Sequence, residues 1–307
     1  MKTTYQKFKK RLKEGGIIIL DGGVGTELQR RGIEMDETWC GSASLNEETL
    51  KKIHLDYILA GCEVITTNTY ASSRIMLDAA NLGAHFEEIN VKAIKAAFLA
   101  SKKSVDKTVL IAGSLSHRFP IYNGNKQSKP ENKIDDLEFK SSCEELANFL
   151  TLNGCDLIIL EMMYDPERMQ TVMEAAQITG LPIWAGFSAR RGRDGDILSF
   201  MSEKEILFED LLDMALNYDF DVVGVMHTNV DEISDSLAIL KSRFDLPLMV
   251  YPDSGGWVSP NWDFDNIIKP EELLKRTETW VKEGAQIIGG CCGLSPEHIA
   301  AISILRK

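Results

Sequence analysis

Short apolar runs, each ending at a glycine or a polar residue, recur eight times along this chain of 307 residues. Most of them are continuous in apolar residues, which is typical of strands buried on both faces of a parallel sheet. Stretches with helical periodicity separate them. The runs are residues 16–20, 63–67, 109–112, 156–160, 182–187, 221–226, 247–250 and 286–289. This alternation predicts an α/β fold, and a closed (β/α)8 TIM barrel is the simplest architecture for eight such units.

The domain organisation is expected to be simple. Residues 1–307 are predicted to form a single domain, because no Pro-, Gly- or Ser-rich linker divides the chain and barrels commonly reach this length. Residues 1–14 predict an N-terminal helix with an amphipathic pattern. The polar segment 114–136 follows the third run, on the face where barrels keep their active sites, and is interpreted as a long loop and candidate lid.

Composition favours a small-molecule partner. The formal net charge of -12 argues against nucleic acid or an anionic membrane surface as a partner. No apolar run approaches the roughly 20 residues that span a bilayer, and residues 1–14 lack the apolar core of a signal peptide. We therefore expect a cytoplasmic protein whose six cysteines are thiols or metal ligands.

Two adjacent cysteines, Cys291 and Cys292, follow the last apolar run. Neighbouring side chains of a regular strand point to opposite faces, so both sulfurs reach one metal ion only if the backbone bends. Gly289, Gly290 and Gly293 permit that bend. Thiolates suit Zn²⁺. The alternative is a pair of buried cysteines that behave as small hydrophobic residues, but the glycines and the rest of the chain favour a metal site.

Polar residues that end the other runs supply the remaining ligands of such a site. In a barrel these residues converge on one mouth. His227 is the predicted third zinc ligand, since imidazole is a good Zn²⁺ donor; a hydrogen-bonded structural imidazole is the alternative. Two thiolates and one imidazole leave a fourth position open, which indicates catalysis. Asp21 and Glu161 either cap helices, or pair with arginines of segment 190–193, or face the pocket and bind a substrate amino group.

Nearly the whole chain resembles the homocysteine S-methyltransferase family of zinc barrels, including its betaine- and S-methylmethionine-dependent members. The matching motifs are Asp21–Leu28, Ala60–Tyr70, Tyr251–Gly255, Ile288–Gly293 and Pro296–His298. The resemblance implies a barrel in which zinc, bound by paired cysteines and a third cysteine, holds homocysteine as a thiolate. That thiolate attacks a methyl group on an onium compound or a methylfolate. The short chain is more similar to members that do not use the folate.

The resemblance also implies roles for single residues. Cys291 and Cys292 match the paired zinc ligands, while Asp21 and Glu161 match catalytic-site carboxylates that hold the amino acid part of the acceptor. Substrate-binding roles are implied for Gly22, Thr26, Glu27, Trp39, Asn68, Tyr70, Tyr251 and Ser254. Of these, Trp39 and Tyr70 resemble the aromatic residues around betaine, because a methylated cation is attracted to ring faces; packing in the core is the alternative.

The chain departs from the family at the third zinc ligand. The segment Gly224–Asn229 has His227 where the family has cysteine. Two thiolates and one imidazole give a neutral site, so a bound sulfur would be more acidic and less nucleophilic. The predicted function is zinc-dependent methyl transfer to homocysteine, giving methionine, from S-methylmethionine, S-adenosylmethionine, betaine or dimethylsulfoniopropionate. The alternatives are a barrel that binds a thiol or onium compound without turnover and a zinc hydrolase.

Overall fold

The eight predicted strands form one parallel sheet in the computed structural model, which describes residues 3–36, 38–103, 108–120, 134–201, 203–258 and 261–306. In spatial order the strands are β1 (Ile18–Ile19), β12 (Ala285–Ile288), β9 (Leu248–Asp253), β8 (Val222–Asn229), β5 (Ile183–Phe187), β4 (Leu157–Met163), β3 (Leu110–Ser116) and β2 (Val64–Thr66). A parallel bridge between Leu20 and Val64 joins β1 to β2 and closes the sheet. The predicted (β/α)8 barrel is confirmed.

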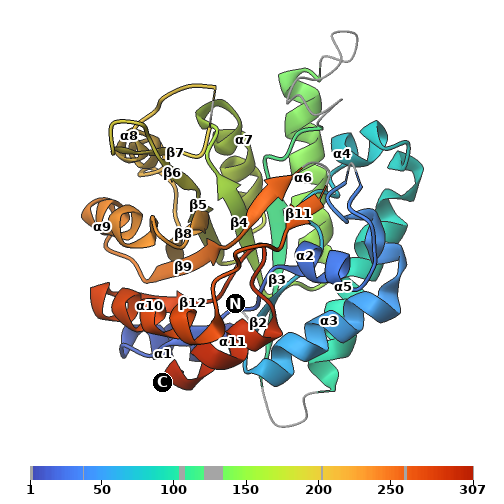
Figure 1. Ribbon diagram of the computed structural model, residues 1–307. Helices are drawn as coiled ribbons and strands as arrows, with labels where there is room; N and C mark the ends of the chain where they lie inside the picture. Colours follow the sequence, from blue (N-terminus) through green and yellow to red (C-terminus); the bar gives the residue numbers. More distant parts are fainter. Residues whose placement is uncertain are drawn as a thin grey trace.

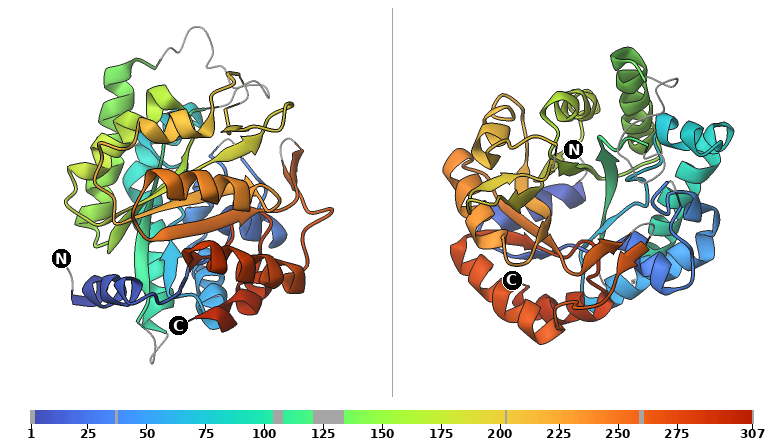
Figure 2. Two further views of the ribbon diagram at one scale, coloured as in Figure 1. Left: turned by 90° about the vertical axis from the view of Figure 1, so that its left-hand side faces the viewer. Right: turned by 45° about the horizontal axis from the view of Figure 1, so that its top comes forward.

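Helices surround the barrel, as Figure 1 and the right-hand view of Figure 2 show. They are α2 (Val24–Arg30), α3 (Glu47–Ala60), α4 (Arg74–Ala79), α5 (Phe86–Lys102), α6 (Asp136–Leu152), α7 (Pro166–Gln177), α8 (Phe208–Asp213), α9 (Ile233–Arg243), α10 (Pro270–Glu283) and α11 (Pro296–Ile302), with 3-10 turns η1 (Ser42–Leu45), η2 (Gly83–His85) and η3 (Ser303–Leu305). Their boundaries follow local chemistry: Asp165 caps α7 by accepting from Glu167 N, and Gly284 ends α10 at φ 122°. Within the described ranges, no helix combines the length and hydropathy that crossing a membrane requires.

The core has two layers. One lies between the strands and the surrounding helices, and the other fills the barrel itself. Helix α1 (Thr3–Lys13) contributes Tyr5, Phe8 and Leu12 to the inner layer. Tyr5 Oη accepts a hydrogen bond of 3.0 Å from Nε1 of Trp184, a fully buried residue of β5. The helix therefore closes the amino end of the barrel.

The segment predicted as a lid is partly regular structure. Ser114–Ser116 belong to β3, because their backbone pairs with β4. Helix α6 begins at Asp136, after Asp135 accepts a hydrogen bond from Glu138 N. Residues 121–133 lie outside the described residues, so the lid remains a prediction.

Two hairpins extend from the carboxyl ends of the barrel strands and were not predicted from the sequence. The first, β6 (Ala189–Arg191) with β7 (Ile197–Ser199), follows β5. The second, β10 (Gly256–Val258) with β11 (Asn261–Asp263), follows β9. The left-hand view of Figure 2 shows α1 at the opposite end of the barrel from the first hairpin. Both hairpins thus add side chains at the end where the candidate site residues gather.

Candidate active site

Strands β4 and β8 are irregular where they reach the mouth of the barrel. Their pairing shifts register between Leu160 and Met163 in β4, and between Met226 and Asn229 in β8. Met162 and His227 have positive φ angles of 57° and 43°. Such angles are uncommon for residues other than glycine, and bulges that contain them redirect nearby side chains. Both irregularities lie beside one cavity, which is where strained backbone concentrates in enzymes.

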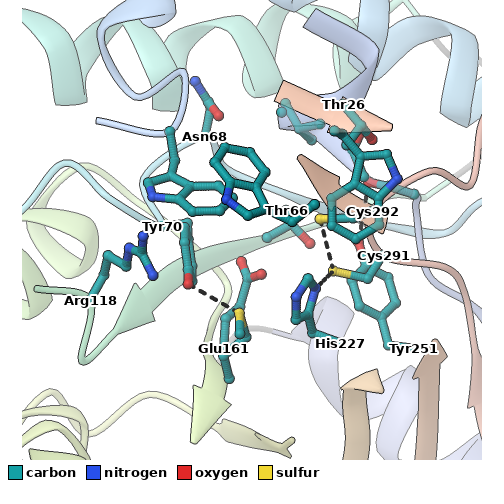
Figure 3. Close-up of a pocket in the computed structure, with 18 of the residues that line it drawn as sticks. Thr26, Thr66, Asn68, Tyr70, Arg118, Glu161, His227, Tyr251, Cys291 and Cys292 are labelled. Atoms are coloured by element: carbon teal, nitrogen blue, oxygen red, sulfur yellow. Dashed lines mark hydrogen bonds between the residues drawn. The ribbon is translucent and has the colours of Figure 1, made fainter. Parts of the chain in front are cut away.

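A cavity of about 410 Å³ occupies the carboxyl end of the barrel. Ten residues predicted for the site line it: Gly22, Thr26, Trp39, Asn68, Tyr70, Glu161, His227, Tyr251, Cys291 and Cys292. Figure 3 shows how several of them face the cavity. The strands thus bring together most of the residues that the sequence separates by up to about 270 positions.

His227, Cys291 and Cys292 form one compact group. Nδ1 of His227 lies 3.4 Å from Sγ of Cys291, and the two sulfurs lie 3.9 Å apart. All three ligand atoms lie within 4.8 Å of one another. Tetrahedral zinc, with bonds of about 2.0–2.3 Å, requires about 3.4–3.8 Å between ligand atoms. Two of the three separations are close to this range and the third is at most 4.8 Å, so the three side chains could hold a zinc ion after a small adjustment. The partial exposure of Cys292 leaves one side of the group open to the cavity.

Glycines place the two cysteines by allowing close backbone contacts. A Cβ atom on Gly289 would lie 2.8 Å from the carbonyl oxygen of Asp21, and one on Gly293 would lie 2.0 Å from that of Ser254. Gly293 also has φ 81°. Cys291 N donates a hydrogen bond to Pro252 O, which ties this turn to the end of β9. The glycine frame seen in the sequence therefore serves close packing as well as bending.

Burial and the neighbouring groups shift the pKa of His227 in opposite directions. Burial disfavours its charged form, but the carboxylate of Asp253, with Oδ2 at 3.4 Å from Nδ1, and the sulfur of Cys291 raise the pKa of His227 to about 9. The hydrogen bond with Cys292, together with burial, raises the pKa of the Cys291 thiol. Zinc binds neutral imidazole and deprotonated sulfur, so metal binding at this group would release protons.

The two predicted carboxylates occupy different environments. Glu161 is partly exposed in the cavity and accepts a hydrogen bond from Ser114 Oγ, and burial raises its pKa to about 7. Asp21 is fully buried behind the cavity wall. It accepts hydrogen bonds from Thr66 N, Thr66 Oγ1 and Tyr251 Oη at 2.6, 3.0 and 3.1 Å. Glu161 can thus meet a substrate directly, whereas Asp21 holds the wall in place.

Two other predicted substrate-binding residues are absent from the cavity wall. Glu27 pairs with Arg30 at 3.0 Å and Arg31 at 3.5 Å on the turns of its own helix. Ser254 Oγ accepts from Ile268 N at 2.8 Å, which fixes the chain after the second hairpin. Both side chains are engaged in structural bonds. The motifs located the two residues in the sequence but did not reveal which way their side chains point.

Aromatic side chains form much of the cavity wall. Tyr70 Oη donates to Met162 Sδ at 3.1 Å. Trp39 stacks on Trp257 of the second hairpin, with ring centroids 4.4 Å apart. Sequence reasoning missed Tyr164, Phe200, Trp257 and Trp262, and also the cations Arg118 and Arg190. The two tryptophans follow the 251–255 motif closely, which was a usable signal, but the others come from loops and hairpins with no motif.

Comparisons with known proteins agree with this architecture. The family model described as homocysteine S-methyltransferase matches residues 18–305. The chain is 28% identical to homocysteine S-methyltransferase 1 of Saccharomyces cerevisiae, over 94% of each chain. It is 26% identical to selenocysteine Se-methyltransferase of Brassica oleracea var. italica, over 97% of this chain and 92% of that one. The metallated form of the homocysteine methyltransferase MmuM from Escherichia coli has the same fold, with a TM-score of 0.73 and 23% identity over 95% of this chain and 97% of that one.

Proposed function

The chain belongs to the homocysteine S-methyltransferase family and is an S-methyltransferase acting on a thiol; from this we propose zinc-dependent methyl transfer from a small onium donor to homocysteine, giving methionine. The observation that carries the proposal is the group of His227, Cys291 and Cys292, open to a cavity that also contains Glu161. These three side chains would hold the zinc ion. The group lies where a small thiol entering the cavity would meet it.

When bound, zinc would lower the pKa of a thiol at the open fourth position, so that the acceptor is available as a thiolate. With Zn²⁺, the set of two thiolates and one imidazole is neutral overall. A neutral site favours deprotonation of the acceptor thiol but makes the bound thiolate less nucleophilic. Cys291 and His227 are buried, and this low-polarity setting strengthens their electrostatic interactions.

The residues of the chain itself contribute mainly positioning. Glu161 offers carboxylate oxygens to the ammonium group of the acceptor, while the aromatic wall with Tyr70 and Phe200 replaces the water around a methylated cation. In the transfer, a bond forms between the acceptor sulfur and the methyl carbon. The bond from that carbon to the onium sulfur or nitrogen breaks, and its electron pair stays on the donor, which leaves without its positive charge.

A transfer assay with a metal determination tests the proposal. The purified protein is expected to contain about one zinc per chain and to methylate homocysteine with at least one of S-methylmethionine, S-adenosylmethionine, betaine and dimethylsulfoniopropionate. Selenocysteine belongs in the acceptor panel, because a relative is named for its methylation. Zinc without turnover of any donor would favour the binding-only alternative, and a reaction independent of thiol would favour hydrolysis.

Glu161→Gln sharpens the assay at the acceptor. We expect KM for homocysteine to rise about 10- to 100-fold, because a hydrogen bond to a charged group contributes about 1.5–3 kcal/mol. Zinc content is expected to stay unchanged, since Glu161 is outside the metal group. Glu167→Gln is the matched control, because Glu167 is an exposed residue of the neighbouring α7 that pairs with Lys204. An unchanged KM in the Glu161 variant would remove this residue from acceptor binding.

A further inference from the structure

Arg118 is a charged residue of the cavity wall, and two of its buried donor atoms have no hydrogen-bond partner in the described part of the chain. It lies just beyond the end of β3, after His117, and lines the cavity. Its Nε and Nη2 atoms are buried, and neither has a hydrogen-bond partner among the described residues. Buried donors of a guanidinium are normally paired, since leaving them unpaired costs free energy. The unused donors at a cavity wall therefore point to a ligand as their partner.

The guanidinium is held against an aromatic ring. Its central carbon lies 4.3 Å from the ring centroid of Trp39, a cation–π distance. Trp39 is itself fixed by stacking on Trp257. The Trp39 ring, which the sequence suggested as a contact for a methylated cation, is thus already in contact with the positive charge of Arg118. A bare cation next to this group would be repelled, while an anion would be attracted.

Arg190 provides an internal comparison. It also lines the cavity, but its Nε and Nη2 atoms donate to the carbonyl oxygen of Met201 at 3.2 and 3.1 Å. Its donors are therefore engaged in holding the chain after the first hairpin. Of the two arginines in the wall, Arg118 is the one with buried Nε and Nη2 atoms that no described residue accepts from.

The cavity has two chemically different ends. Figure 3 shows Arg118 beyond Tyr70 and Glu161, away from His227 and the two cysteines. Under the proposed function, the acceptor thiol belongs at the metal group and its ammonium group at Glu161. The far end, with Arg118, then falls to the methyl donor.

We propose that Arg118 binds the carboxylate that each of the candidate donors carries beside its methylated onium centre, and is therefore a specificity-determining residue for the methyl donor. The planar guanidinium fork suits a carboxylate, which it can bind through two parallel hydrogen bonds. The aromatic wall near Tyr70 would receive the onium centre, between the carboxylate and the thiol. This inference rests on the proposed function for the placement of the acceptor.

Binding of paired ligands tests the inference without requiring turnover. Calorimetry on the intact protein compares dimethylsulfoniopropionate with trimethylsulfonium, and betaine with tetramethylammonium, so that each pair differs by a carboxylate. The wild type is expected to prefer the carboxylate-bearing member by about 10- to 100-fold. Arg118→Met is expected to abolish that preference, and Arg118→Lys to restore part of it, because lysine keeps the charge without the fork.

Arg168→Met is the matched control. Arg168 also lies over an aromatic ring, 3.9 Å from the centroid of Phe119, but it does not line the cavity. Its variant is expected to keep the wild-type preference. Thermal unfolding of each variant identifies any loss of fold that would mimic a loss of binding.

Three results would overturn the inference. The wild type binds neither zwitterion, or it binds both members of a pair equally, or Arg118→Met weakens homocysteine binding while donor preference persists. The last result would assign the guanidinium to the acceptor's carboxylate. Failure of the proposed function gives a different pattern, since a protein that prefers zwitterions yet methylates no thiol would retain the Arg118 subsite without the reaction.

Discussion

The two ends of the barrel are built on the same strands but satisfy their polar groups differently. At the amino end, Tyr5 accepts from Trp184, and the guanidinium of Arg11 forms two hydrogen bonds of 2.8 and 2.6 Å with the carboxylate of Glu63. Of the donors of Arg11, only the buried Nε lacks a partner among the described residues, whereas at the carboxyl end both Nε and Nη2 of Arg118 lack one. One end is closed by interactions within the chain, and the other keeps binding capacity for molecules that enter.

The two ends of the barrel also differ in backbone conformation, and the strained residues lie at the carboxyl end. Trp39, Met162 and His227 line the cavity and have positive φ angles. For a residue other than glycine, such a conformation costs roughly 1–3 kcal/mol. Helix α1 and the starts of the strands at the amino end contain no such residue among those described. The packed end thus contributes stability that offsets strain at the end with the chemistry.

The largest effect is expected from removing a zinc ligand, which should abolish metal binding and activity while leaving folding nearly unchanged. Cys291→Ser and Cys292→Ser are each expected to lose zinc and to reduce kcat/KM by at least about 1000-fold, because removal of a ligand exceeds the roughly 10- to 100-fold effect of outer contacts. Unfolding of the metal-free proteins should change little. Metal analysis and transfer assays check this, with Cys143→Ala, a buried cysteine of α6, as control. Full zinc content in either serine variant would contradict the assigned ligand set.

The next effect concerns the pH dependence of stability. Burial raises the pKa of Asp21 to about 7, above its unfolded value of about 3.9. From about pH 4 to about pH 7 the folded chain holds a proton that the unfolded chain has released, so stability falls as pH rises. The contribution is at most about 4 kcal/mol. Glu161, whose pKa burial also raises to about 7, contributes a slope of the same sign. Asp21→Asn should therefore make the fall of urea-unfolding stability between these pH values shallower, whereas Asp56→Asn, which alters a partly exposed ion pair, should not. Equal slopes in wild type and Asp21→Asn would refute the shift.

A smaller effect is expected at the amino end. Tyr5→Phe leaves the buried Nε1 of Trp184 without its acceptor, which should lower the free energy of unfolding by about 1–3 kcal/mol and leave kcat/KM unchanged. Tyr70→Phe is the matched change at the carboxyl end, where the hydroxyl donates to the weak acceptor Met162 Sδ. It should alter donor KM more than stability. The comparison fails if Tyr5→Phe impairs transfer as strongly as Tyr70→Phe does.

The smallest effect is expected from His227→Cys. The three thiolates should retain zinc, while the charge of the site changes from neutral to -1 and makes a bound sulfur more nucleophilic. We expect transfer rates within about tenfold of wild type, since the change alters charge and leaves the ligand count intact. Metal analysis and single-turnover transfer check this. Loss of zinc in this variant would show that His227 has a different task.

Sequence patterns predicted the architecture because that architecture follows from local chemistry. Eight apolar runs, most of them continuous, indicated a sheet buried on both faces, and all eight are strands of the barrel. The glycines around Cys291 and Cys292 indicated a turn that brings two sulfurs together, and those sulfurs lie 3.9 Å apart. The position of His227 at the end of a strand placed it at the mouth, where it lies beside Cys291.

Side-chain direction was decided by tertiary structure alone. Asp21 and Glu161 looked equivalent in sequence, yet bonds from Thr66 and Tyr251 turn the first carboxylate behind the wall. Arg118 was one polar residue in a predicted loop, and only the folded barrel shows that it lines a cavity and that two of its buried donors have no partner among the described residues. Hydrophobic periodicity predicts helices and strands because the free energy gained on burial is roughly proportional to the apolar area removed from water and needs no particular partner. Hydrogen bonds and charges depend on the direction and distance of one particular partner, and such partners come from parts of the chain that meet only in the folded barrel.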